Sequence, residues 1–459
     1  MQNEITPQKI IEICNGLLLT SNIENKFNNF VIDSRKVKKG DCFVAIRGEN
    51  NNGNRFLEMA LEKGASVCLV DEMPEEKIVK KYNNSTIIKV EDGIKAIQEI
   101  AKYKRSLYDI PVVAVTGSVG KTSTKDIIAS VLSQKYNVLK TEGNFNNHIG
   151  LPMTLLKLKD HTAIVVEMGM NHFKEISVLT NIAKPTIAVI TNIGTSHIGN
   201  LGSRENILKA KLEILEGLPK NGTVIINNDN DLLNNWAQTV DNYNVVTYGI
   251  VNKSKLISKE IKERNDGTEY KVNINEKEYE VKVPVGGKHF IYNSLCAIAV
   301  GKTLNIEPEK IIQGISSFKL TAKRMDFRKV KNGAIVLADY YNASYDSVKS
   351  ALEVVKTYKT NRRIAVLGDM LELGDFAKKL HEEVGNEVFK NNIDILITVG
   401  ELSKNIAKTA KEKGLKEVYE CDNNKEAAQI LNAKIQKNDL ILLKASNGMK
   451  FGEIFDAIL

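Results

Sequence analysis

The sequence lacks the features of membrane-spanning, secreted and nucleic-acid-binding proteins. No stretch of its 459 residues approaches the roughly 18 uninterrupted apolar residues that a membrane-spanning helix needs. The N-terminal stretch MQNEITPQKIIEICNGLLL has no basic segment followed by an apolar run, which argues against a secretory signal peptide. The net charge is only +8, without the concentrated basic stripe that a nucleic-acid partner favours. We therefore expect a cytoplasmic protein with no membrane span and no nucleic-acid partner.

Cysteine is scarce, and linker sequence is absent. The cysteines are Cys14, Cys42, Cys68, Cys296 and Cys421, an odd number with no pair at metal-ligand spacing. This pattern favours reduced thiols. No segment is rich in proline or serine, and none is of low complexity. With 42% apolar and 26% charged residues, the chain is long enough for about three globular domains.

Residues 1–84 are expected to form a small mixed α/β unit. Two short strands flank a Lys-Gly turn in FVIDSRKVKKGDCFVAIRG (30–48). A helix is predicted in FLEMALEKGA (56–65), ending at Gly64, and SVCLVDE (66–72) follows as a strand. A further helix over 93–108 leads into the next unit.

Residues 85–318 are expected to form a doubly wound α/β sheet. The apolar runs VVAV (112–115), AIVVEMGM (163–170), TIAVITNI (186–193) and TVIINND (223–229) are typical of strands covered on both faces, and helical patterns lie between them. A β-rich insertion is expected around 275–290, before a helix that starts near Asn293.

Residues 319–459 repeat this alternation. Strands are predicted in GAIVLADY (333–340), RRIAVLGDM (362–370), IDILITVG (393–400) and DLILLKAS (439–446), and no glycine-rich loop follows any of them. The prediction is therefore an α/β protein of three domains. They are a small N-terminal cap, a central ATPase-like sheet and a C-terminal Rossmann-like lobe.

The stretch VVAVTGSVGKTSTKDII, Val112–Ile128, predicts a phosphate-binding loop between a strand and a helix. Gly117 and Gly120 enclose two residues, where the usual loop has four. Backbone N–H groups at a helix N-terminus attract anions, Lys121 can reach the outer phosphates, and Thr122 can hold Mg²⁺. The alternative, a plain glycine turn, is disfavoured by the complete Gly-Lys-Thr. The predicted nucleotide-binding residues are Gly117, Ser118, Val119, Gly120, Lys121, Thr122 and Ser123.

Three further groups are candidates for chemistry. Glu167 ends a buried apolar run, so its carboxylate needs a compensating partner, which is either a metal ion at the strand's carboxyl end or a lysine. In ITNIGTSHIGNLGSRENILKAKLEI (190–214), His197 lies in a polar turn and Lys211 in the following helix, although a solvated histidine and a surface lysine remain alternatives. The polar turn in TEGNFNNHIGLP (141–152) can line a substrate groove with Asn144, Asn146 and Asn147, or simply form a turn.

Together these motifs resemble the Mur ligase family, the ATP-dependent amide-forming enzymes of peptidoglycan precursor synthesis, whose phosphate loop has this short form. The resemblance covers essentially the whole chain. It also rests on IDSRKVKKGDCFVAIRG (32–48), VVEMGMNHFKEI (165–176), ADYYNASYDSVKSAL (338–352) and AVLGDMLELGDFAKKLHEEVG (365–385). Within the family, the chain is most similar to the member that adds D-alanyl-D-alanine to UDP-N-acetylmuramoyl-tripeptide.

The resemblance implies ATP and Mg²⁺ as cofactors and an acyl-phosphate intermediate. The implied substrates are UDP-N-acetylmuramoyl-tripeptide and D-alanyl-D-alanine. Lys121 would contact the ATP phosphates, and Thr122 with Glu167 would hold one Mg²⁺. The other implied roles are a second Mg²⁺ on His197 and a carbamylated Lys211, adenine on Asn293, phosphate and ribose on Arg324 and Asp339, and the UDP-sugar near Asp33, Ser34 and Arg35. A monomer is expected.

The sequence departs from the family pattern at three places. Related ligases carry Asp-Asp-Ser-Tyr-Asn-Ala where this chain has ADYYNA, so Ala338 replaces an aspartate and Tyr340 replaces a serine. Tyr345 stands where a proline is frequent, and Asn447 where an arginine is usual. The alternatives are a ligase for the third amino acid, a folylpolyglutamate synthase, which the N-terminal cap disfavours, and a paralogue that binds nucleotide or precursor without ligating.

Overall fold

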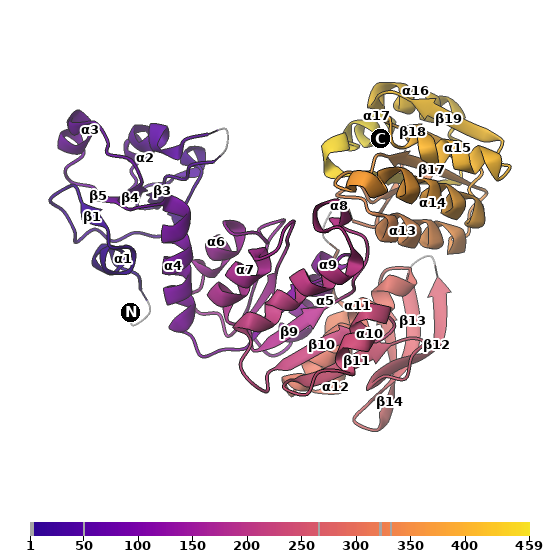
Figure 1. Ribbon diagram of the computed structural model, residues 1–459, viewed down its shortest axis with the longest axis horizontal. Coiled ribbons are helices and arrows are strands. Elements are labelled where there is room, and N and C mark those ends of the chain that lie inside the picture. Colours follow the sequence, from indigo (N-terminus) through magenta and orange to yellow (C-terminus); the bar gives the residue numbers. More distant parts are fainter. Residues whose placement is uncertain (1–3, 49–50, 265–266, 321–323, 331–332) are drawn as a thin grey trace.

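The computed structural model describes residues 4–48, 51–264, 267–320, 324–330 and 333–459, and it contains three β-sheets that follow one another along the chain (Figure 1). The first sheet lies at one end of the molecule, the second in the middle and the third at the other end. The predicted α/β class is confirmed. None of the helices in the described ranges combines the length and apolar character that a membrane crossing needs.

The first sheet has the strand order β1-β5-β4-β3-β2. Its strands are β1 Leu17–Leu18, β2 Phe30–Val31, β3 Cys42–Val44, β4 Val67–Val70 and β5 Thr86–Lys89, all parallel except β1. The helical segments are α1 Pro7–Cys14, η1 Ser34–Lys36, η2 Gly53–Phe56, α2 Leu57–Glu62, α3 Glu76–Lys81 and α4 Gly93–Ser106. Because side chains alternate along a strand, Cys42 and Val44 face one core and Phe43 the other.

The second sheet has the order β14-β13-β12-β11-β10-β9-β6-β8-β7. Its strands are β6 Val112–Thr116, β7 Val138–Lys140, β8 Ala163–Glu167, β9 Ile187–Ile190, β10 Thr223–Asn227, β11 Asn244–Gly249, β12 Leu256–Arg264, β13 Gly267–Ile274 and β14 Lys277–Val283. The strands from β6 to β12 pair in parallel, and β12, β13 and β14 pair antiparallel. This antiparallel part is the β-rich insertion, which begins earlier in the sequence than predicted.

Helices cover both faces of the second sheet. They are α5 Lys121–Leu132, α6 Gly150–Leu155, α7 Glu175–Ala183, α8 Ile198–Leu201, α9 Arg204–Leu212, η3 Glu213–Gly217, α10 Asp231–Ala237, α11 Lys288–Thr303 and α12 Pro308–Ser316. The helix predicted near Asn293 begins at Lys288, because Phe290 and Ile291 already belong to its buried face. All five residues of β6 and all five of β8 are buried, as expected for strands covered on both sides.

The third sheet has the order β15-β16-β20-β17-β18-β19 and is parallel except for β15. Its strands are β15 Asp326–Lys329, β16 Ile335–Ala338, β17 Arg362–Gly368, β18 Ile395–Val399, β19 Glu417–Cys421 and β20 Asp439–Lys444. Its helical segments are α13 Tyr345–Thr357, η4 Gly374–Phe376, α14 Ala377–Lys390, α15 Lys404–Glu412, α16 Asn424–Lys434, η5 Asn447–Met449 and α17 Gly452–Ile458. The four predicted strands are confirmed, and the sequence interpretation missed the two edge strands.

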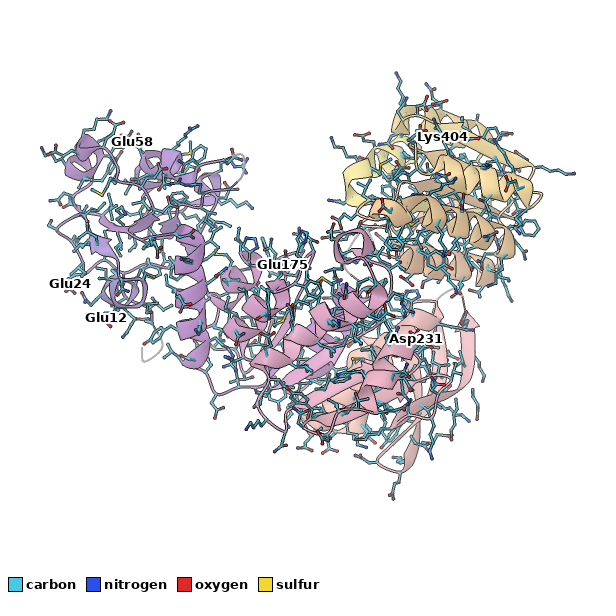
Figure 2. All side chains as sticks on the ribbon, viewed as in Figure 1. Glu12, Glu24, Glu58, Glu175, Asp231 and Lys404 are labelled. Carbon is cyan, nitrogen blue, oxygen red and sulfur yellow. The ribbon has the colours of Figure 1, made fainter. Side chains whose placement is uncertain are left out.

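The division of the chain at residues 84 and 318 stays a prediction. The first sheet includes β5, which begins at Thr86, so its last strand falls just beyond the predicted end of the first unit. We call the part around the third sheet the C-terminal lobe and the part around the second sheet the central part. Charged side chains such as Glu58 and Lys404 lie on the outside of the two end parts (Figure 2).

Candidate active site

The short glycine loop connects β6 to α5 in a conformation that requires glycine. Gly117 has φ +149°, and a Cβ there would lie 1.9 Å from Thr191 Oγ1. Gly120 has φ +84° and caps the N-terminus of α5. The turn after β9 holds the loop, because Asn192 Oδ1 accepts a 2.9 Å bond from the Val119 N–H. The loop is therefore fixed from a second strand end before any ligand binds.

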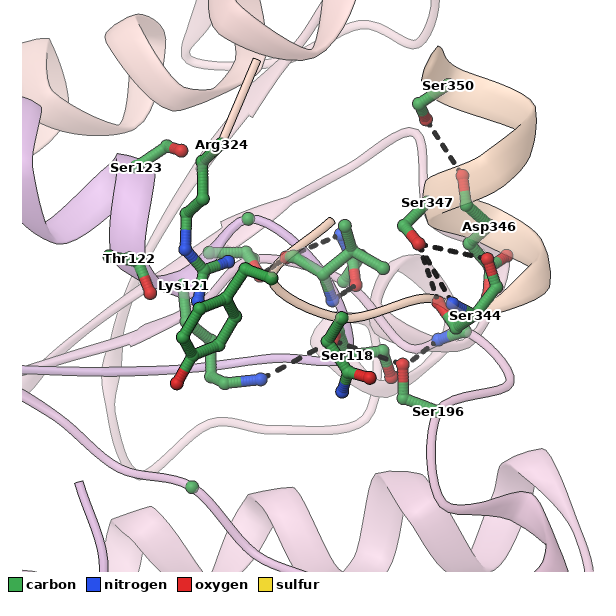
Figure 3. Close-up of a pocket in the computed structure, with 18 of the residues that line it drawn as sticks. Ser118, Lys121, Thr122, Ser123, Ser196, Arg324, Ser344, Asp346, Ser347 and Ser350 are labelled. Carbon is green, nitrogen blue, oxygen red and sulfur yellow. Dashed lines mark hydrogen bonds between the residues drawn. The ribbon is translucent and has the colours of Figure 1, made fainter. Parts of the chain in front are cut away.

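The loop presents unpaired donors to a pocket (Figure 3). Among the described residues, the backbone N–H groups of Gly120, Lys121 and Thr122 have no acceptor, as is usual at a helix N-terminus. The Lys121 ammonium folds back onto the loop and donates 2.8 Å to the Gly117 carbonyl. Burial lowers the pKa of Lys121, and the Glu167 carboxylate partly opposes this shift. This end of α5 is a cradle for anions.

Glu167 lies at the end of β8 with both oxygens engaged by neutral groups. Its Oε2 accepts from the Thr122 hydroxyl at 2.8 Å, and its Oε1 accepts from the Asn146 amide at 2.8 Å. The side chain is buried, and no lysine in the described part of the chain forms an ion pair with it. Of the two alternatives left by the sequence, the lysine partner is thus not found. The carboxylate therefore lies beside the glycine loop without a cationic partner among the described residues.

Asn293, on α11, has an unsatisfied amide that faces the same pocket. Its Oδ1 accepts 3.0 Å from the Thr124 hydroxyl, whereas its buried Nδ2 has no partner among the described residues. A buried donor without an acceptor is unfavourable and indicates a missing ligand atom. Its position beside Gly120 places this donor next to the anion cradle.

The C-terminal lobe contributes Arg324 and Asp339 to the pocket. The Arg324 guanidinium stacks on the Tyr341 ring, 4.0 Å from its centroid. The Asp339 carboxylate accepts 2.5 Å from the Lys444 ammonium and 3.2 Å from the Met325 N–H. Lys444 is itself buried, so this ion pair fixes Asp339 at the pocket wall. The pocket that the central part and the C-terminal lobe share has a volume of about 600 Å³.

His197 and Lys211 occupy different environments. His197 lines the pocket, and its Nδ1 lies 2.7 Å from Glu372 Oε2 of the C-terminal lobe, a close contact whose angle does not meet hydrogen-bond geometry. The His197 ring lowers the pKa of the Glu372 carboxyl. Lys211 is only 1% exposed and has no partner in the described ranges. Burial, followed by the charge of Lys121, lowers the pKa of Lys211 far below its ordinary value.

Most of the predicted site residues come together in this pocket. Those that line it are Ser118, Val119, Gly120, Lys121, Thr122, Ser123, Asn144, Asn146, Asn147, Glu167, His197, Asn293, Arg324 and Asp339. Gly117 and Lys211 are not in the lining, although Lys211 lies near enough to Lys121 to feel its charge.

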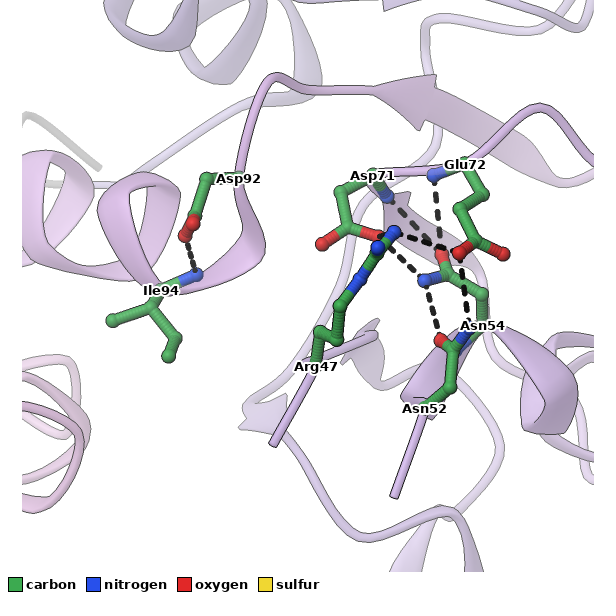
Figure 4. A network of polar contacts seen from close by, with 7 residues as sticks. All are labelled: Arg47, Asn52, Asn54, Asp71, Glu72, Asp92 and Ile94. Atoms are coloured by element: carbon green, nitrogen blue, oxygen red, sulfur yellow. Dashed lines mark hydrogen bonds and ion pairs between the residues drawn. The ribbon is translucent and has the colours of Figure 1, made fainter. Parts of the chain in front are cut away.

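Ser34 and Arg35, predicted to hold the UDP-sugar, lie elsewhere. They form η1 at the carboxyl end of β2, where the exposed Arg35 guanidinium donates 2.9 Å to Asp33. At the carboxyl ends of β3 and β4, Arg47 pairs with Glu72 at 2.6 Å within a polar network (Figure 4). The carboxyl edge of a parallel sheet is a common ligand position. A substrate site in this first part of the chain stays a prediction.

Several pocket residues were missed by the sequence interpretation. Asn192, Tyr341, Lys444 and Glu372 all contact predicted site residues. Lys444 could have been found from the sequence, because it ends the apolar strand DLILLK just as Glu167 ends AIVVE. A charged group at the end of a buried strand indicates a partner or ligand there.

The three departures from the family pattern have separate positions. Tyr340 is buried in the core of the C-terminal lobe, with its ring 5.8 Å from that of Phe455, and it does not line the pocket. Tyr345 begins α13. Asn447 begins η5 and is exposed at the pocket. Of the three, only Asn447 can meet a ligand in this pocket directly.

Comparison with known proteins covers nearly the whole chain. Family models match at residues 26–105 (Mur ligase family, catalytic domain), 115–301 (Mur ligase middle domain) and 323–447 (Mur ligase, glutamate ligase domain). A UDP-N-acetylmuramoyl-tripeptide–D-alanyl-D-alanine ligase of Bacillus subtilis is 37% identical over 453 residues, covering 98% of this chain and 97% of the relative.

Solved structures agree with this assignment. MurF from Acinetobacter baumannii superposes with a TM-score of 0.89 at 25% identity, covering 99% of this chain and 98% of that one. MurF ligase from Thermotoga maritima, solved in complex with ADP, gives a TM-score of 0.82 at 27% identity, with coverages of 94% and 97%. Since the matched models span most of the sequence and the relatives align with it from end to end, the chain belongs to the Mur ligase family.

Proposed function

We propose that this chain is an ATP-dependent ligase that joins D-alanyl-D-alanine to the peptide carboxyl group of UDP-N-acetylmuramoyl-tripeptide through an acyl phosphate, a step of peptidoglycan precursor synthesis. The observation that carries the proposal is the shared pocket, in which the phosphate loop and Glu167 meet Arg324 and Asp339 of the C-terminal lobe. The names of the full-length relatives supply the substrates.

The donors and charges in the pocket fit ATP. The free N–H groups at the start of α5 and the Lys121 ammonium suit its phosphates. The orphan amide of Asn293 suits a ring nitrogen of adenine, and the Asp339 carboxylate suits the ribose hydroxyls. Lys121 has only loop carbonyls as partners here, so it can turn to a phosphate at little cost.

The oxygen atoms beside the loop fit Mg²⁺. The Thr122 hydroxyl and the Glu167 carboxylate lie 2.8 Å apart, and Mg²⁺ typically takes one or two protein oxygens, with the remaining positions held by water and phosphate. In the described residues no three His, Cys, Asp or Glu side chains gather as a preformed metal site. Bound Mg²⁺ would supply charge neutralisation to the phosphoryl transfer.

His197 and Lys211 are the proposed ligands for a second ion. Burial lowers the pKa of Lys211, which favours the neutral amine, and a neutral amine can add carbon dioxide. The nitrogen attacks the carbon, a proton leaves, and the side chain becomes an anionic carbamate. The protonated form of Lys211 would repel Mg²⁺, whereas the carbamate would attract it.

The chain's own residues would act by positioning and electrostatics. Lys121 and Arg324 lower the repulsion between the anionic peptide carboxylate and the γ-phosphate, which must approach each other. The carboxylate would attack the γ-phosphorus and release ADP. The dipeptide amine would then attack the acyl carbon, lose a proton and displace inorganic phosphate. Since no enzyme nucleophile takes part, the pocket walls must exclude water from that intermediate.

The substrate sites are proposed on both sides of the phosphate loop. Ser34 and Arg35 would hold the UDP-sugar in the substrate-binding unit, residues 1–84, while Asn144, Asn146 and Asn147 would guide the peptide toward ATP in the unit 85–318. The unit 319–459 would bring the dipeptide. We also propose that the protein is a monomer.

The test is phosphate release from ATP with purified protein. Release that requires both UDP-N-acetylmuramoyl-tripeptide and D-alanyl-D-alanine supports the proposal, and Lys121→Ala serves as the inactive control. Release with the dipeptide replaced by a single amino acid would identify the third-residue ligase instead. Nucleotide binding without any amide product would identify the non-ligating paralogue.

A further inference from the structure

Two turns, one from the central part and one from the C-terminal lobe, touch backbone to backbone beside the pocket. The first contains His197 and Gly199, and the second contains Glu372 and Gly374. The Gly199 N–H donates 3.2 Å to the Glu372 carbonyl. A Cβ on Gly199 would lie 2.5 Å from the Gly374 nitrogen, so a larger residue there would push the turns apart. This contact requires close approach of the two parts.

The residues that face each other across this contact both adopt an uncommon backbone conformation. His197 has φ +63° and Glu372 has φ +64°, in the left-handed region that non-glycine residues rarely occupy. Such conformations persist where the surroundings impose them, and they concentrate at functional sites. Both side chains line the pocket. With these backbone conformations, the two side chains meet at 2.7 Å across the contact.

The side-chain contact selects one nitrogen of the imidazole. Nδ1 of His197 is buried 2.7 Å from Glu372 Oε2, and no other described polar atom is its partner. The angle of this contact does not meet hydrogen-bond geometry, but a carboxylate, which accepts and does not donate, still favours by its charge the tautomer with the proton on the nearby Nδ1. Nε2 then keeps its lone pair. A carboxylate behind a histidine in this way is the usual arrangement when the other nitrogen binds a cation.

We propose that Glu372 is a positioning residue that fixes the tautomer and orientation of His197 for the second ion, and that it does so only while the C-terminal lobe is docked on the central part. The proposal rests on the proposed function, in which His197 is a metal ligand. It adds a physical link between lobe position and ion binding, because the ligand and its orienting carboxylate belong to different lobes. A simple bridge between lobes would need no particular tautomer.

The substitutions are chosen to separate these two possibilities. Glu372→Ala removes the acceptor, whereas Glu372→Gln keeps a neutral oxygen at the same place. The Glu372 side chain is half exposed, so neither change opens the core. Asp375→Asn removes an exposed carboxylate from the same turn and is the matched control. His197→Gln assigns the histidine signals.

The first measurement is nitrogen NMR of isotope-labelled histidine in the whole protein, without nucleotide or metal, in buffer alkaline enough for neutral imidazole. The wild type, Asp375→Asn and Glu372→Gln should show His197 with its proton on Nδ1, and Glu372→Ala should show a mixture of tautomers. An unchanged tautomer in Glu372→Ala overturns the proposal. This readout needs no substrate, so it stands apart from the ligase assay.

The second measurement is Mn²⁺ affinity in the presence of ADP, followed by electron paramagnetic resonance. Loss of a residue that orients a metal ligand typically costs 10- to 100-fold in metal affinity, so we expect about a tenfold loss in Glu372→Ala. Glu372→Gln should recover part of it, and Asp375→Asn should match the wild type. Equal affinity in Glu372→Ala and the wild type, or equal losses in Glu372→Ala and Asp375→Asn, would also overturn the proposal.

Discussion

Replacing Lys211 by methionine should make the protein more stable and much less active. The side chain is 1% exposed, it has no partner among the described residues, and the nearby Lys121 repels its charged form. Each unit by which burial lowers a lysine pKa costs the folded state about 1.4 kcal/mol when the group is protonated in both states. Methionine has a similar length and no charge, and swaps that conserve volume cost less than about 1.5 kcal/mol.

The pH dependence has a definite sign. The pKa of Lys211 is lowered in the folded state from the ordinary value of 10.5. Below the folded pKa the amine is protonated in both states and the full cost applies. Between the folded pKa and 10.5 only the unfolded chain binds the proton, so stability rises with pH. The stability advantage of Lys211→Met over the wild type should therefore shrink as the pH rises toward 10.5.

Activity should change in the opposite direction. If the carbamate of Lys211 holds a second ion, its loss removes a preorganised electrostatic group, which costs on the order of 10²-fold in rate, or about 2.7 kcal/mol. Free energies of unfolding would be measured by urea titration in bicarbonate-free buffer, and rates by phosphate release. Isotope-labelled bicarbonate should give a carbamate carbonyl signal that Lys211→Met lacks.

Lys209→Met is the matched control, since Lys209 lies on the same helix but is exposed. Lys209→Met should leave both the free energy of unfolding and the rate of phosphate release close to the wild-type values. A Lys211→Met protein that is less stable and fully active would show that the lysine is structural, and the reasoning would fail. A stabilised protein with normal activity would leave the burial argument standing but refute the catalytic role.

Three further outcomes follow from contacts around the pocket. Asp346→Asn weakens the 2.7 Å and 2.9 Å hydrogen bonds that Asp346 accepts from Thr195, and steady-state kinetics should show a KM for ATP raised about tenfold. Thr195→Val should show part of the same increase in KM, and wild-type kinetics in both variants would contradict the prediction. Lys444→Met leaves the Asp339 carboxylate unpaired, so urea titration should show a free energy of unfolding lower by about 3 kcal/mol. The double variant that also carries Asp339→Asn should recover part of that stability. Asn447→Arg should alter the KM for the dipeptide more than the KM for ATP, and the reverse order would show that Asn447 faces the nucleotide.

The strands of the fold were predictable where they are buried on both faces. The runs at β6, β8, β9 and β10 are continuously apolar, short and rich in β-branched residues, which favours buried strands over helices. In the third sheet the missed strands are those at the edges. β15 reads DFRK and β19 reads EVYEC, and both carry charges because one side of an edge strand meets solvent. Their pairing depends on neighbours that local sequence does not reveal.

The candidate site was predictable where a chemical motif is contiguous. Lys121 and Thr122 lie in one loop, and Glu167 follows a buried strand, so residue type and local structure were enough. The residues that hold them in place were not predictable, because each comes from another element. Tyr341 under Arg324 is an example, since only the fold brings that ring to the guanidinium.

The turn after β9 connects the glycine loop to the C-terminal lobe. Asn192 holds the glycine loop through Val119, Thr195 donates to Asp346 of the C-terminal lobe, and His197 contacts that lobe again immediately before α8 begins. The C-terminal lobe and the glycine loop therefore contact the same short stretch of backbone. If nucleotide binding and lobe docking are coupled through this stretch, each must bias the other by the same free energy.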